Sequence, residues 1–497
     1  MPTLPRRRSS REDSELTAVE PHIRDAWHRE DKEENVGSPR YLIHTLGCQM
    51  NERDSEIMAG QLETMGYAPT AAEDEADLII INTCAVRGSA EDHALGHIGR
   101  LKQLKAQHPH MTLAVAGCMA QEPKTIAWLK RHAPHVDLVF GTHNLHQLRR
   151  LLDEAEQHEE MLVEVWKSAG DTLAEHVPSR RKQGVRAQVN IIYGCDKFCT
   201  YCIVPFTRGR ERSRRLDDVL AEVQALAGEG YEAITFLGQN VNSYGHDFDP
   251  PVDLADLLTR VEPIEGIRWL HFMTPHPRDF SQKLLEFIGQ SHKVSRQLHL
   301  PVQAGSNPIL RRMNRKYTRE QYLDLIARAR SVIEDVTFTT DIIVGFPGET
   351  EEDFALTLDL VQQVRFDSAF TFLYSAREGT PAARWEDRDP VPNPVKKDRL
   401  NRLMALQYQI SWEANQHLLG TTPVVLVEGR SKKDPHVWAA RTQQGKVVLV
   451  ERETETDLTD RFVPVRITVA KTFYVAGRIA GEPLNAPPRR AKSIPMW

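Results

Sequence analysis

The sequence predicts an α/β protein of several domains: a parallel-sheet domain, a larger domain of repeated β/α units and a small antiparallel β-barrel. Three observations lead to this. An apolar strand, a turn and a cysteine recur three times before residue 140. Strands alternate with amphipathic helices after residue 185, and short strands with turns replace helical patterns after residue 417. At 497 residues the chain has room for two to four domains.

Composition excludes several classes of protein. No apolar run approaches the roughly 20 residues that span a bilayer, and the first arginines are followed by acidic residues, unlike a secretory signal. We therefore expect a cytoplasmic protein. The net charge of −6 argues against a protein that coats nucleic acid non-specifically. All six cysteines precede Ile203, in two groups of three, which favours metal ligation in a reducing compartment over a disulfide framework.

Residues 1–38 are polar and carry charges of both signs without a sustained period, so we expect a disordered extension. The first domain is expected over residues 39–155. Helical stretches, such as those at 55–65 and 90–107, separate its strands, and this order predicts a parallel sheet with helices on both faces. Its strands are expected at 41–46, 78–81, 113–116 and 136–140.

A cysteine follows each of the first three strands: Cys48, Cys84 and Cys118. Because the carboxyl ends of parallel strands share one edge, where ligands bind, the three thiols are expected to meet and to hold a metal cluster. The alternative is that all three are small buried apolar side chains, which is common for free cysteine. Their equivalent positions in three successive units favour the cluster.

Residues 156–184 are interpreted as a linker, and the second domain is expected over residues 185–416. It opens with a β-branched strand from Val189 that leads into Cys195, Cys199 and Cys202. Three thiolates on so short a loop suit one soft metal centre, and Gly194 allows the turn that brings them together. An iron–sulfur cluster with one open iron fits better than zinc, which usually recruits a fourth ligand. A zinc knuckle or unrelated thiols are the alternatives.

Six strands, each followed by a helix, predict a partial (βα)6 TIM barrel for this domain. Catalytic residues are then expected in the loops at the carboxyl ends of the strands, and those loops are rich in glycine, proline, amide and hydroxyl groups. The later strands are expected at 233–237, 269–273, 297–300, 337–344 and 369–374, and the helices at 216–228, 254–261, 282–288, 319–333 and 351–364.

The third domain, over residues 417–482, is predicted to be a small antiparallel barrel of the OB-like kind, a frequent nucleic-acid platform. Arg430, Lys432 and Lys433 supply positive charge, although such charges are usually only a solvated face. The tail at 483–497 is expected to be disordered. The strands are expected at 424–427, 438–441, 446–450, 461–470 and 473–475.

The cysteine spacing, with Tyr201 before the last cysteine, resembles the radical S-adenosylmethionine superfamily, in which three cysteines hold a [4Fe-4S] cluster. Over roughly residues 40–480 the domain order resembles its methylthiotransferase family: a flavodoxin-like cluster domain, a radical core and a terminal TRAM domain. The segments YGCDKFCTYCIVPFTRGRERSR, FLGQNVNSYG and LHLPVQAGSN look most like the tRNA-modifying branch that makes 2-methylthio-N6-isopentenyladenosine.

The resemblance implies sulfur insertion at C2 of N6-isopentenyladenosine at tRNA position 37, followed by methylation. It implies two [4Fe-4S] clusters, with S-adenosylmethionine as radical source and methyl donor. The catalytic groups would be the six cysteines: the later triplet would chelate S-adenosylmethionine through its open iron, and the earlier triplet would present sulfur. The implied partners are a tRNA anticodon stem-loop, an electron donor and a sulfur source, and the protein is expected to be a monomer.

Strand-end position and the family analogy together select residues for the S-adenosylmethionine pocket: Tyr201, Gln239, Asn240, Gln303, Ser306, Ile343 and Glu349. RNA contacts are expected from the barrel cations named above and from Arg208, Arg210, Arg212, Arg214 and Arg215. We interpret the arginine stretch as mixed, with some side chains facing phosphates and others pairing with carboxylates of the core.

Two related functions share this mechanism: modification of threonylcarbamoyl-adenosine in tRNA, and modification of an aspartate of a ribosomal protein. By resemblance, the loop GQNVNSYG and the run of arginines favour the isopentenyladenosine enzyme. A function of a different class is a non-catalytic iron–sulfur protein that binds RNA or carries sulfur. Two cysteine triplets that each lack a fourth ligand argue against it, because a structural site normally closes its coordination.

Overall fold

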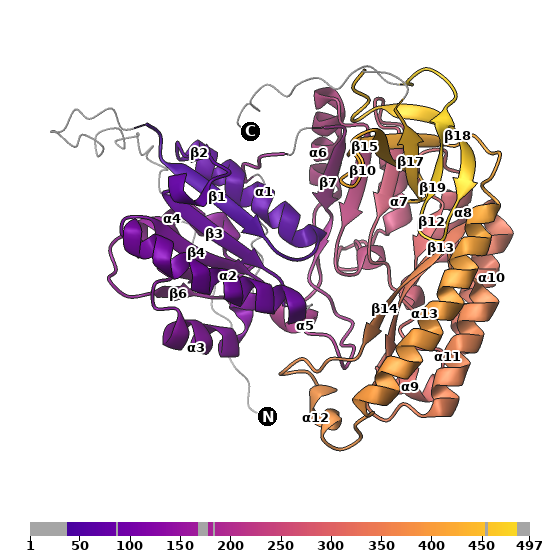
Figure 1. Ribbon diagram of the computed structural model, residues 1–497, viewed down its shortest axis with the longest axis horizontal. Coiled ribbons are helices and arrows are strands. Elements are labelled where there is room, and N and C mark those ends of the chain that lie inside the picture. Colours follow the sequence, from indigo (N-terminus) through magenta and orange to yellow (C-terminus); the bar gives the residue numbers. More distant parts are fainter. Residues whose placement is uncertain (1–36, 86–87, 167–176, 182–183, 453–455, 485–497) are drawn as a thin grey trace, which may run out of the picture. The chain divides into compact units, whose positions relative to one another are not determined.

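The computed structural model describes residues 37–85, 88–166, 177–181, 184–452 and 456–484. Most of the two segments expected to be disordered, and part of the expected linker, lie outside these residues. The chain divides into two units, residues 1–38 and 39–497, and every described helix and strand belongs to the second (Figure 1). Among the described residues, no helix combines the length and the apolarity needed to cross a membrane.

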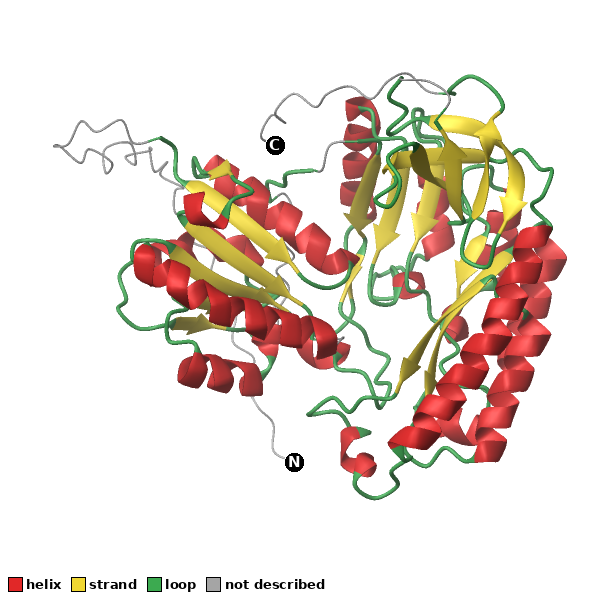
Figure 2. Cartoon of the chain, in the orientation of Figure 1, coloured by secondary structure: helices red, strands yellow, loops and turns green. Residues whose placement is uncertain are grey.

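The first domain is a six-stranded parallel sheet in the order β2-β1-β3-β4-β5-β6 (Figures 1 and 2). Its helices are α1 (Gln49–Thr64), α2 (Gly88–Gln107), α3 (Pro123–His132) and α4 (Leu148–Ala155), with 3-10 turns η1 (Glu73–Glu75), η2 (Met119–Gln121) and η3 (Leu145–Gln147). Its strands are β1 (Arg40–Thr45), β2 (Ala68–Pro69), β3 (Leu78–Thr83), β4 (Thr112–Gly117), β5 (Leu138–Phe140) and β6 (Leu162–Glu164).

Two apolar cores cover the two faces of this sheet, which explains the unbroken apolar run in β3. Leu78 and Ile80 point into the core shared with α1 and α4, whereas Ile79 and Ile81 point into the core shared with α2 and α3. A strand buried on both faces cannot alternate apolar with polar residues. The predicted parallel sheet is confirmed.

The short edge strands β2 and β6 were not predicted. Strand β6 pairs with β5 and lies in the segment interpreted as a linker, so the sheet extends past residue 155. Its three residues are only half-buried, because they form the edge of the sheet. A strand this short lacks the length of pattern that sequence reasoning needs.

The second domain contains two three-stranded parallel sheets, β11-β10-β7 and β12-β13-β14, joined by a bridge between Leu270 and Val294. The predicted partial barrel is confirmed, and the expected strands match within a few residues. The strands are β7 (Arg186–Asn190), β10 (Ala233–Leu237), β11 (Trp269–Phe272), β12 (Gln297–His299), β13 (Thr337–Val344) and β14 (Ser368–Leu373). The helices include α6 (Leu216–Glu229), α7 (Leu254–Val261), α8 (Gln282–Gln290), α9 (Asn307–Arg312), α10 (Arg319–Val332) and α11 (Glu351–Val364), with turns η4 (Val241–Ser243) and η5 (Pro277–Asp279).

Helix α13 (Asn393–Gln416) covers β14 and packs beside α11 (Figure 1), and the sequence did not predict it. Its buried positions recur at helical spacing, but several of them are polar, including Gln407, Ser411 and Asn415. The side-chain amide of Gln407 donates to the Phe366 carbonyl at 2.7 Å. Because the buried amides of Gln407 and Asn415 donate to backbone carbonyls here, polar residues occupy the buried face and the apolar period of the helix is weak. A short helix, α12 (Ala383–Glu386), precedes it.

The third domain is a closed barrel in the order β15-β16-β17-β19-β18, which confirms the predicted small barrel. Its strand pairs are antiparallel as predicted, except that β17 and β19 pair in parallel. Trp438 is buried in its core. Leu426 and Phe462 of the barrel pack against Val185, Ala233 and Trp269, at the amino ends of three strands of the second domain. The barrel strands are β15 (Val424–Arg430), β16 (Val437–Thr442), β17 (Val447–Glu451), β18 (Phe462–Ala470) and β19 (Val475–Ile479).

Candidate active site

Cys48, Cys84 and Cys118 follow β1, β3 and β4 and meet at one edge of the sheet, as the strand positions predict. A hydrogen bond with the Cys84 thiol lowers the pKa of Cys48 to about 5, although burial opposes this. Burial raises the pKa of Cys118, and the guanidinium of Arg208 acts in the opposite direction. We call Cys48, Cys84 and Cys118 the first cysteine triad.

Local geometry holds the first triad together. A Cβ atom on Gly47, whose φ is +149°, would lie 2.5 Å from the Cβ of Cys84, so the close approach of these two loops requires glycine. Asn51 at the start of α1 donates from its side chain to the Thr83 carbonyl at 2.8 Å. The Cys48 thiol in turn donates to the Asn51 side-chain oxygen at 3.3 Å. The loop after β1 is therefore fixed to the end of β3.

Arg208 connects the first triad to the loop that follows Cys202. Its Nε donates to the Cys118 sulfur at 3.1 Å, and its Nη2 donates to the Asp54 carboxylate at 2.7 Å. Both charged side chains are almost fully buried, with exposed fractions of 6% and 2%. A buried guanidinium beside thiols balances the negative charge that thiolates and a bound cluster would bring.

His143 follows β5, at the same edge of the sheet, and its Nε2 is buried without a hydrogen-bond partner among the described residues. Burial, and then the charges of Arg212 and Arg208, lower its pKa to about 4. A buried polar atom without a partner is uncommon and calls for a ligand or water. The sheet edge that carries the first triad therefore offers three sulfur atoms and one imidazole nitrogen, unpartnered among the described residues, to a bound cofactor.

Cys195, Cys199 and Cys202, the second cysteine triad, lie on the loop after β8 (Ile192–Tyr193). A Cβ atom on Gly194, whose φ is +74°, would lie 2.0 Å from the carbonyl oxygen of Arg210. Only glycine therefore fits where the loop passes under the returning chain. Strand β8 pairs antiparallel with β9 (Arg212–Ser213), and the short helix α5 (Val204–Thr207) lies between them in the chain.

The surroundings of the second triad, in which Cys195 and Cys199 are buried and Cys202 is partly buried, disfavour free thiolates. Burial raises the pKa of Cys195 above its usual range, and burial followed by the charge of Cys199 raises that of Cys202 to about 12. Arg315 brings a cation to this triad: its Nη1 lies 3.4 Å from the Cys199 sulfur, and its Nη2 donates to the Pro301 carbonyl at 2.6 Å. Because thiol ligands lose their protons to a metal, this triad is suited to a cluster that supplies positive charge.

The spacing of the sulfur atoms bears on which metal fits. A tetrahedral zinc site with Zn–S bonds of about 2.3 Å places its sulfurs about 3.8 Å apart. Among the described residues, no three cysteine sulfurs lie within 4.8 Å of one another. Neither triad is arranged for a single tetrahedral ion, whereas a polynuclear cluster joins thiolates that are farther apart. Both triads thus fit iron–sulfur clusters.

Gln239 and Asn240, after β10, lie beside the second triad, as predicted for S-adenosylmethionine contacts. The Gln239 side-chain oxygen accepts from the Gly194 amide at 2.5 Å, while its Nε2 is buried without a partner among the described residues. Asn240 donates to Glu211 at 2.9 Å, and its own Oδ1 is equally without a partner. Two unpartnered amide atoms beside the cysteine loop are the kind of groups that a polar ligand satisfies.

The other predicted pocket residues differ in what their side chains do. Ser306 donates to Asp353 at 2.6 Å and caps α9, while Glu349 pairs with Arg399 at 2.8 Å. Both polar groups therefore hold their own loops in this structure, and their role as ligand contacts stays a prediction. Burial raises the pKa of Glu349 to about 6.

Three of the predicted pocket residues keep positions compatible with a ligand. Gln303 adopts a left-handed backbone, with φ of +73°, in the loop that pairs with β13. Ile343 is only partly buried on β13. The Tyr201 ring lies edge-on to Phe346, with 6.5 Å between the ring centroids.

The five arginines after the cysteine loop divide as the mixed interpretation proposes. Arg208 is bound to Asp54, and Arg214 is buried against Glu222 at 2.5 Å, so these two guanidinium groups pair with carboxylates of the core, and their contact with RNA stays a prediction. Arg210 has 74% of its side chain exposed. Arg212 is half-buried and Arg215 is exposed. In the barrel, the three predicted cations are all exposed: Arg430, Lys432 and Lys433.

Sequence reasoning missed several exposed aromatic side chains near the site. Phe198 lies between two cysteines of the second triad and is 46% exposed, with the Arg210 guanidinium 5.9 Å from its ring centroid. Phe370 and Phe372 alternate along β14 on the face opposite α13 and are 58% and 38% exposed. Alternating aromatics would be apolar core in most strands, so only the structure distinguishes these two.

Comparison with known proteins follows the three domains. Residues 40–141 match the family model described as uncharacterized protein family UPF0004, residues 189–361 match the radical SAM superfamily, and residues 416–480 match the TRAM domain. The tRNA-2-methylthio-N(6)-dimethylallyladenosine synthase of Desulforamulus reducens is 48% identical over 456 residues, covering 91% of this chain and 99% of its own. The protein of the same name from Acetivibrio thermocellus is 50% identical over 449 residues, covering 90% and 92%.

The chain belongs to the tRNA-2-methylthio-N(6)-dimethylallyladenosine synthase family. Among solved structures, the radical S-adenosylmethionine methyltransferase TsrM from Kitasatospora setae, with cobalamin and a [4Fe-4S] cluster bound, aligns with a TM-score of 0.51 at 12% identity, covering 85% of this chain and 82% of that one. At this identity the likeness concerns the fold alone.

Proposed function

We propose that this protein is a radical S-adenosylmethionine methylthiotransferase that converts N6-isopentenyladenosine at tRNA position 37 into its 2-methylthio derivative. The observation that carries the proposal is the presence of two separate cysteine triads, each with a buried arginine, in a chain about half identical to the synthase family. Each triad offers three cysteines, whereas a cluster that only stores electrons is normally held by four, so an open iron at each site favours catalysis over electron storage.

The substrate carbon carries an unactivated aromatic C–H bond, which no side-chain base can deprotonate. When bound, the two clusters and S-adenosylmethionine supply the electron, the radical chemistry, the sulfur and the methyl group. The chain itself provides soft ligands from the two triads and a buried cation at each. Gln239 and Asn240 orient the polar end of S-adenosylmethionine with amide atoms that otherwise lack partners.

The target base must leave its stack before a buried site can reach it, and a nucleotide in a loop is the least costly to move. Phe370 and Phe372 on β14 offer an apolar face for the base and its five-carbon substituent. Phe198 and the exposed Phe206 offer stacking surfaces beside the second triad. The exposed guanidinium of Arg210 adds charge for a phosphate.

We propose that the chain forms three domains. The first spans residues 39–155 and also includes β6, the second spans residues 185–416, and the third spans residues 417–482. An electron donor, a sulfur source, a monomeric state and a cytoplasmic location remain predictions.

The proposal is tested with protein reconstituted anaerobically, which should contain roughly eight irons per chain, four for each of two cubane clusters. Incubation with reductant, S-adenosylmethionine, sulfide and isopentenylated tRNA should produce the methylthiolated nucleoside, detected by mass spectrometry after digestion. Activity on threonylcarbamoylated tRNA alone would assign the protein to the related function. An iron content near four would contradict the two-cluster arrangement.

A further inference from the structure

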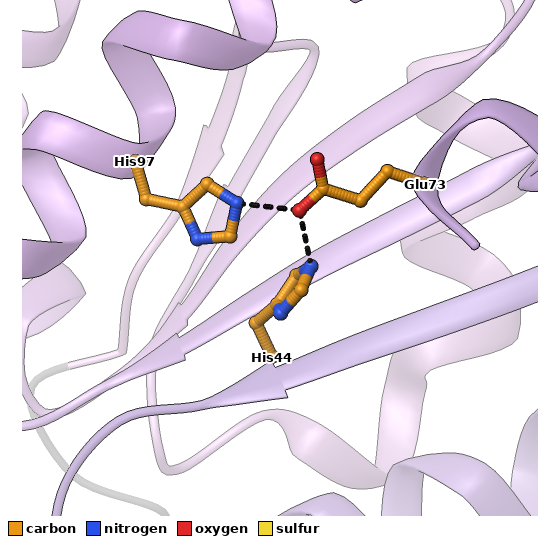
Figure 3. Close-up of side chains that lie close together, drawn as sticks. All are labelled: His44, Glu73 and His97. Atoms are coloured by element: carbon orange, nitrogen blue, oxygen red, sulfur yellow. Dashed lines mark hydrogen bonds and ion pairs between the residues drawn. The ribbon is translucent and has the colours of Figure 1, made fainter. Parts of the chain in front are cut away.

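Three potential metal ligands meet in the first domain, away from both cysteine triads (Figure 3). His44 comes from β1, His97 from α2 and Glu73 from η1. The Nε2 atoms of His97 and His44 lie 2.8 Å and 3.0 Å from the same carboxylate oxygen of Glu73. Among the described residues, no other three histidine, cysteine or carboxylate side chains bring their ligand atoms so close together.

The fold explains why these side chains face one another. His44 projects from β1 on the same face as Leu42, toward the core that α2 covers, and Ile98 beside His97 is buried in that core. The two imidazole rings are 4.4 Å apart between centroids, at 69° to each other. Glu73 reaches them from the turn that precedes β3. Three separate elements therefore contribute one ligand atom each.

Hydrogen bonding alone does not satisfy this group. His97 Nε2 makes a hydrogen bond with Glu73, whereas His44 Nε2, although close to the same oxygen, is buried without a hydrogen-bond partner among the described residues. Two ring nitrogens thus share one carboxylate oxygen: His97 Nε2 forms a hydrogen bond with it, and His44 Nε2 lies 3.0 Å away without hydrogen-bond geometry.

The geometry is close to that of a tetrahedral site. Zinc bonds of about 2.0–2.1 Å to nitrogen and oxygen place neighbouring ligand atoms about 3.3 Å apart. The two nitrogen-to-oxygen distances here are 3.0 Å and 2.8 Å, so a few tenths of an ångström of outward movement would make room for an ion. Glu73 is 41% exposed and His44 27%, which gives an ion an entry path and leaves a fourth position for water.

We propose that His44, Glu73 and His97 form a binding site for one divalent transition-metal ion, with zinc the favoured occupant. Two imidazoles and a carboxylate suit zinc in ligand type and number. A bound ion would fasten η1 and α2 to β1, and β1 leads into Cys48 while α2 follows the loop of Cys84. The ion would act as a brace on the domain that carries the first triad, and the proposal does not depend on the proposed function.

The test uses the full chain with its clusters reconstituted, so that the six thiols are already occupied. Zinc is titrated anaerobically by calorimetry into the wild type, into His97→Gln, and into His93→Gln, an exposed histidine on the same helix that serves as the control. The wild type and His93→Gln should each bind one equivalent, and His97→Gln should bind none. X-ray absorption at the zinc edge should show only nitrogen and oxygen neighbours near about 2.0 Å, without sulfur at about 2.3 Å.

Iron and sulfide content measured on each variant shows whether its clusters are intact. Should His97→Gln fail to retain iron, Glu73→Gln, which changes an exposed turn, provides the same comparison. Absence of a one-equivalent event in the wild type would overturn the proposal. So would equal zinc binding by the wild type and both site variants, or sulfur scattering at the zinc, which would assign the ion to cysteines.

Discussion

Replacing Arg208 by alanine should remove the cluster of the first triad and leave the cluster of the second triad in place. Its guanidinium contacts the Cys118 sulfur and the Asp54 carboxylate, and both charged side chains are almost fully buried. Removing one partner leaves Asp54 buried and unpaired, which typically costs about 3–5 kcal/mol. This is a large fraction of the net stability of a domain, about 5–15 kcal/mol. The first triad should therefore lose its cluster while the second triad keeps its own.

The expected result for Arg208→Ala is an iron content near four per chain instead of about eight. The variant should still cleave S-adenosylmethionine, and it should no longer methylthiolate tRNA. The matched control is Arg210→Ala, two residues further along the same loop. Arg210 pairs with Asp196 at 2.6 Å but is 74% exposed, so water screens the pair and its loss should change stability little. This control should keep its full iron content.

A double replacement distinguishes the pair from the individual residues. The double variant Arg208→Leu with Asp54→Leu removes both charges, so no unpaired carboxylate remains to destabilise the folded state. The urea midpoint of its apoprotein should therefore recover at least half of the loss seen in Arg208→Leu. The reasoning would be refuted if Arg208→Ala matched Arg210→Ala in iron content and in urea midpoint. It would also be refuted if the decrease in urea midpoint of the double variant equalled the sum of the decreases in Arg208→Leu and Asp54→Leu.

Three further predictions concern the ion-pair network, the base pocket and RNA contact. Burial raises the pKa of Glu222, but the charges of Arg214, Arg181 and Arg53 outweigh burial and lower the pKa to about 2. The ionised carboxylate therefore stabilises the folded state at pH values above its ordinary pKa of 4.5, and this contribution is lost as the pH falls toward 2. The urea midpoint of Glu222→Gln should accordingly be lower than that of the wild type at pH 7, with the difference shrinking on acidification; an unchanged difference at pH 3 would contradict this. Phe370→Ala should weaken binding of isopentenylated tRNA by about 1–3 kcal/mol, measured as KM, if the base stacks there, whereas Leu356→Ala, at another exposed apolar residue, on α11, should not. Arg215→Ala should lower the slope of log affinity against log salt by about one if it contacts a phosphate, and an unchanged slope would remove it from the interface.

Sequence patterns predicted those elements in which one property, such as apolarity or a recurring cysteine, marks every position that matters. The run at residues 78–81 is apolar on both sides because both faces of β3 are covered, and it was found without ambiguity. The six cysteines were found because thiols recur at strand ends and at short spacing. Helix α13 was missed because Gln407 and Asn415 are buried through hydrogen bonds, so hydrophobic periodicity does not mark its buried face.

The residues beside the cysteines could not be predicted in the same way. Arg315 approaches Cys199 from the turn after α9, far along the chain, and nothing in its neighbourhood marks it as part of the site. Arg208 and Arg214 belong to a run that looks uniformly basic in the sequence. Whether each of them faces solvent or a carboxylate depends on Asp54 and Glu222, which lie on other elements. Charge in a sequence indicates that partners exist, but only the fold assigns them.

The loop from Gly194 to Arg214 connects both halves of the active site. It contributes the second triad directly, and it contributes Arg208 to the first triad. Its Glu211 accepts from Asn240 at 2.9 Å, and its Arg214 joins Glu222 to the network that reaches α1. A reaction that joins a radical formed at one cluster to sulfur held at another needs both sites fixed by the same structure, because misplacement by about 1 Å can cost about a hundredfold in rate. One loop anchored at both triads meets that need, since neither site can shift without straining buried ion pairs of the other.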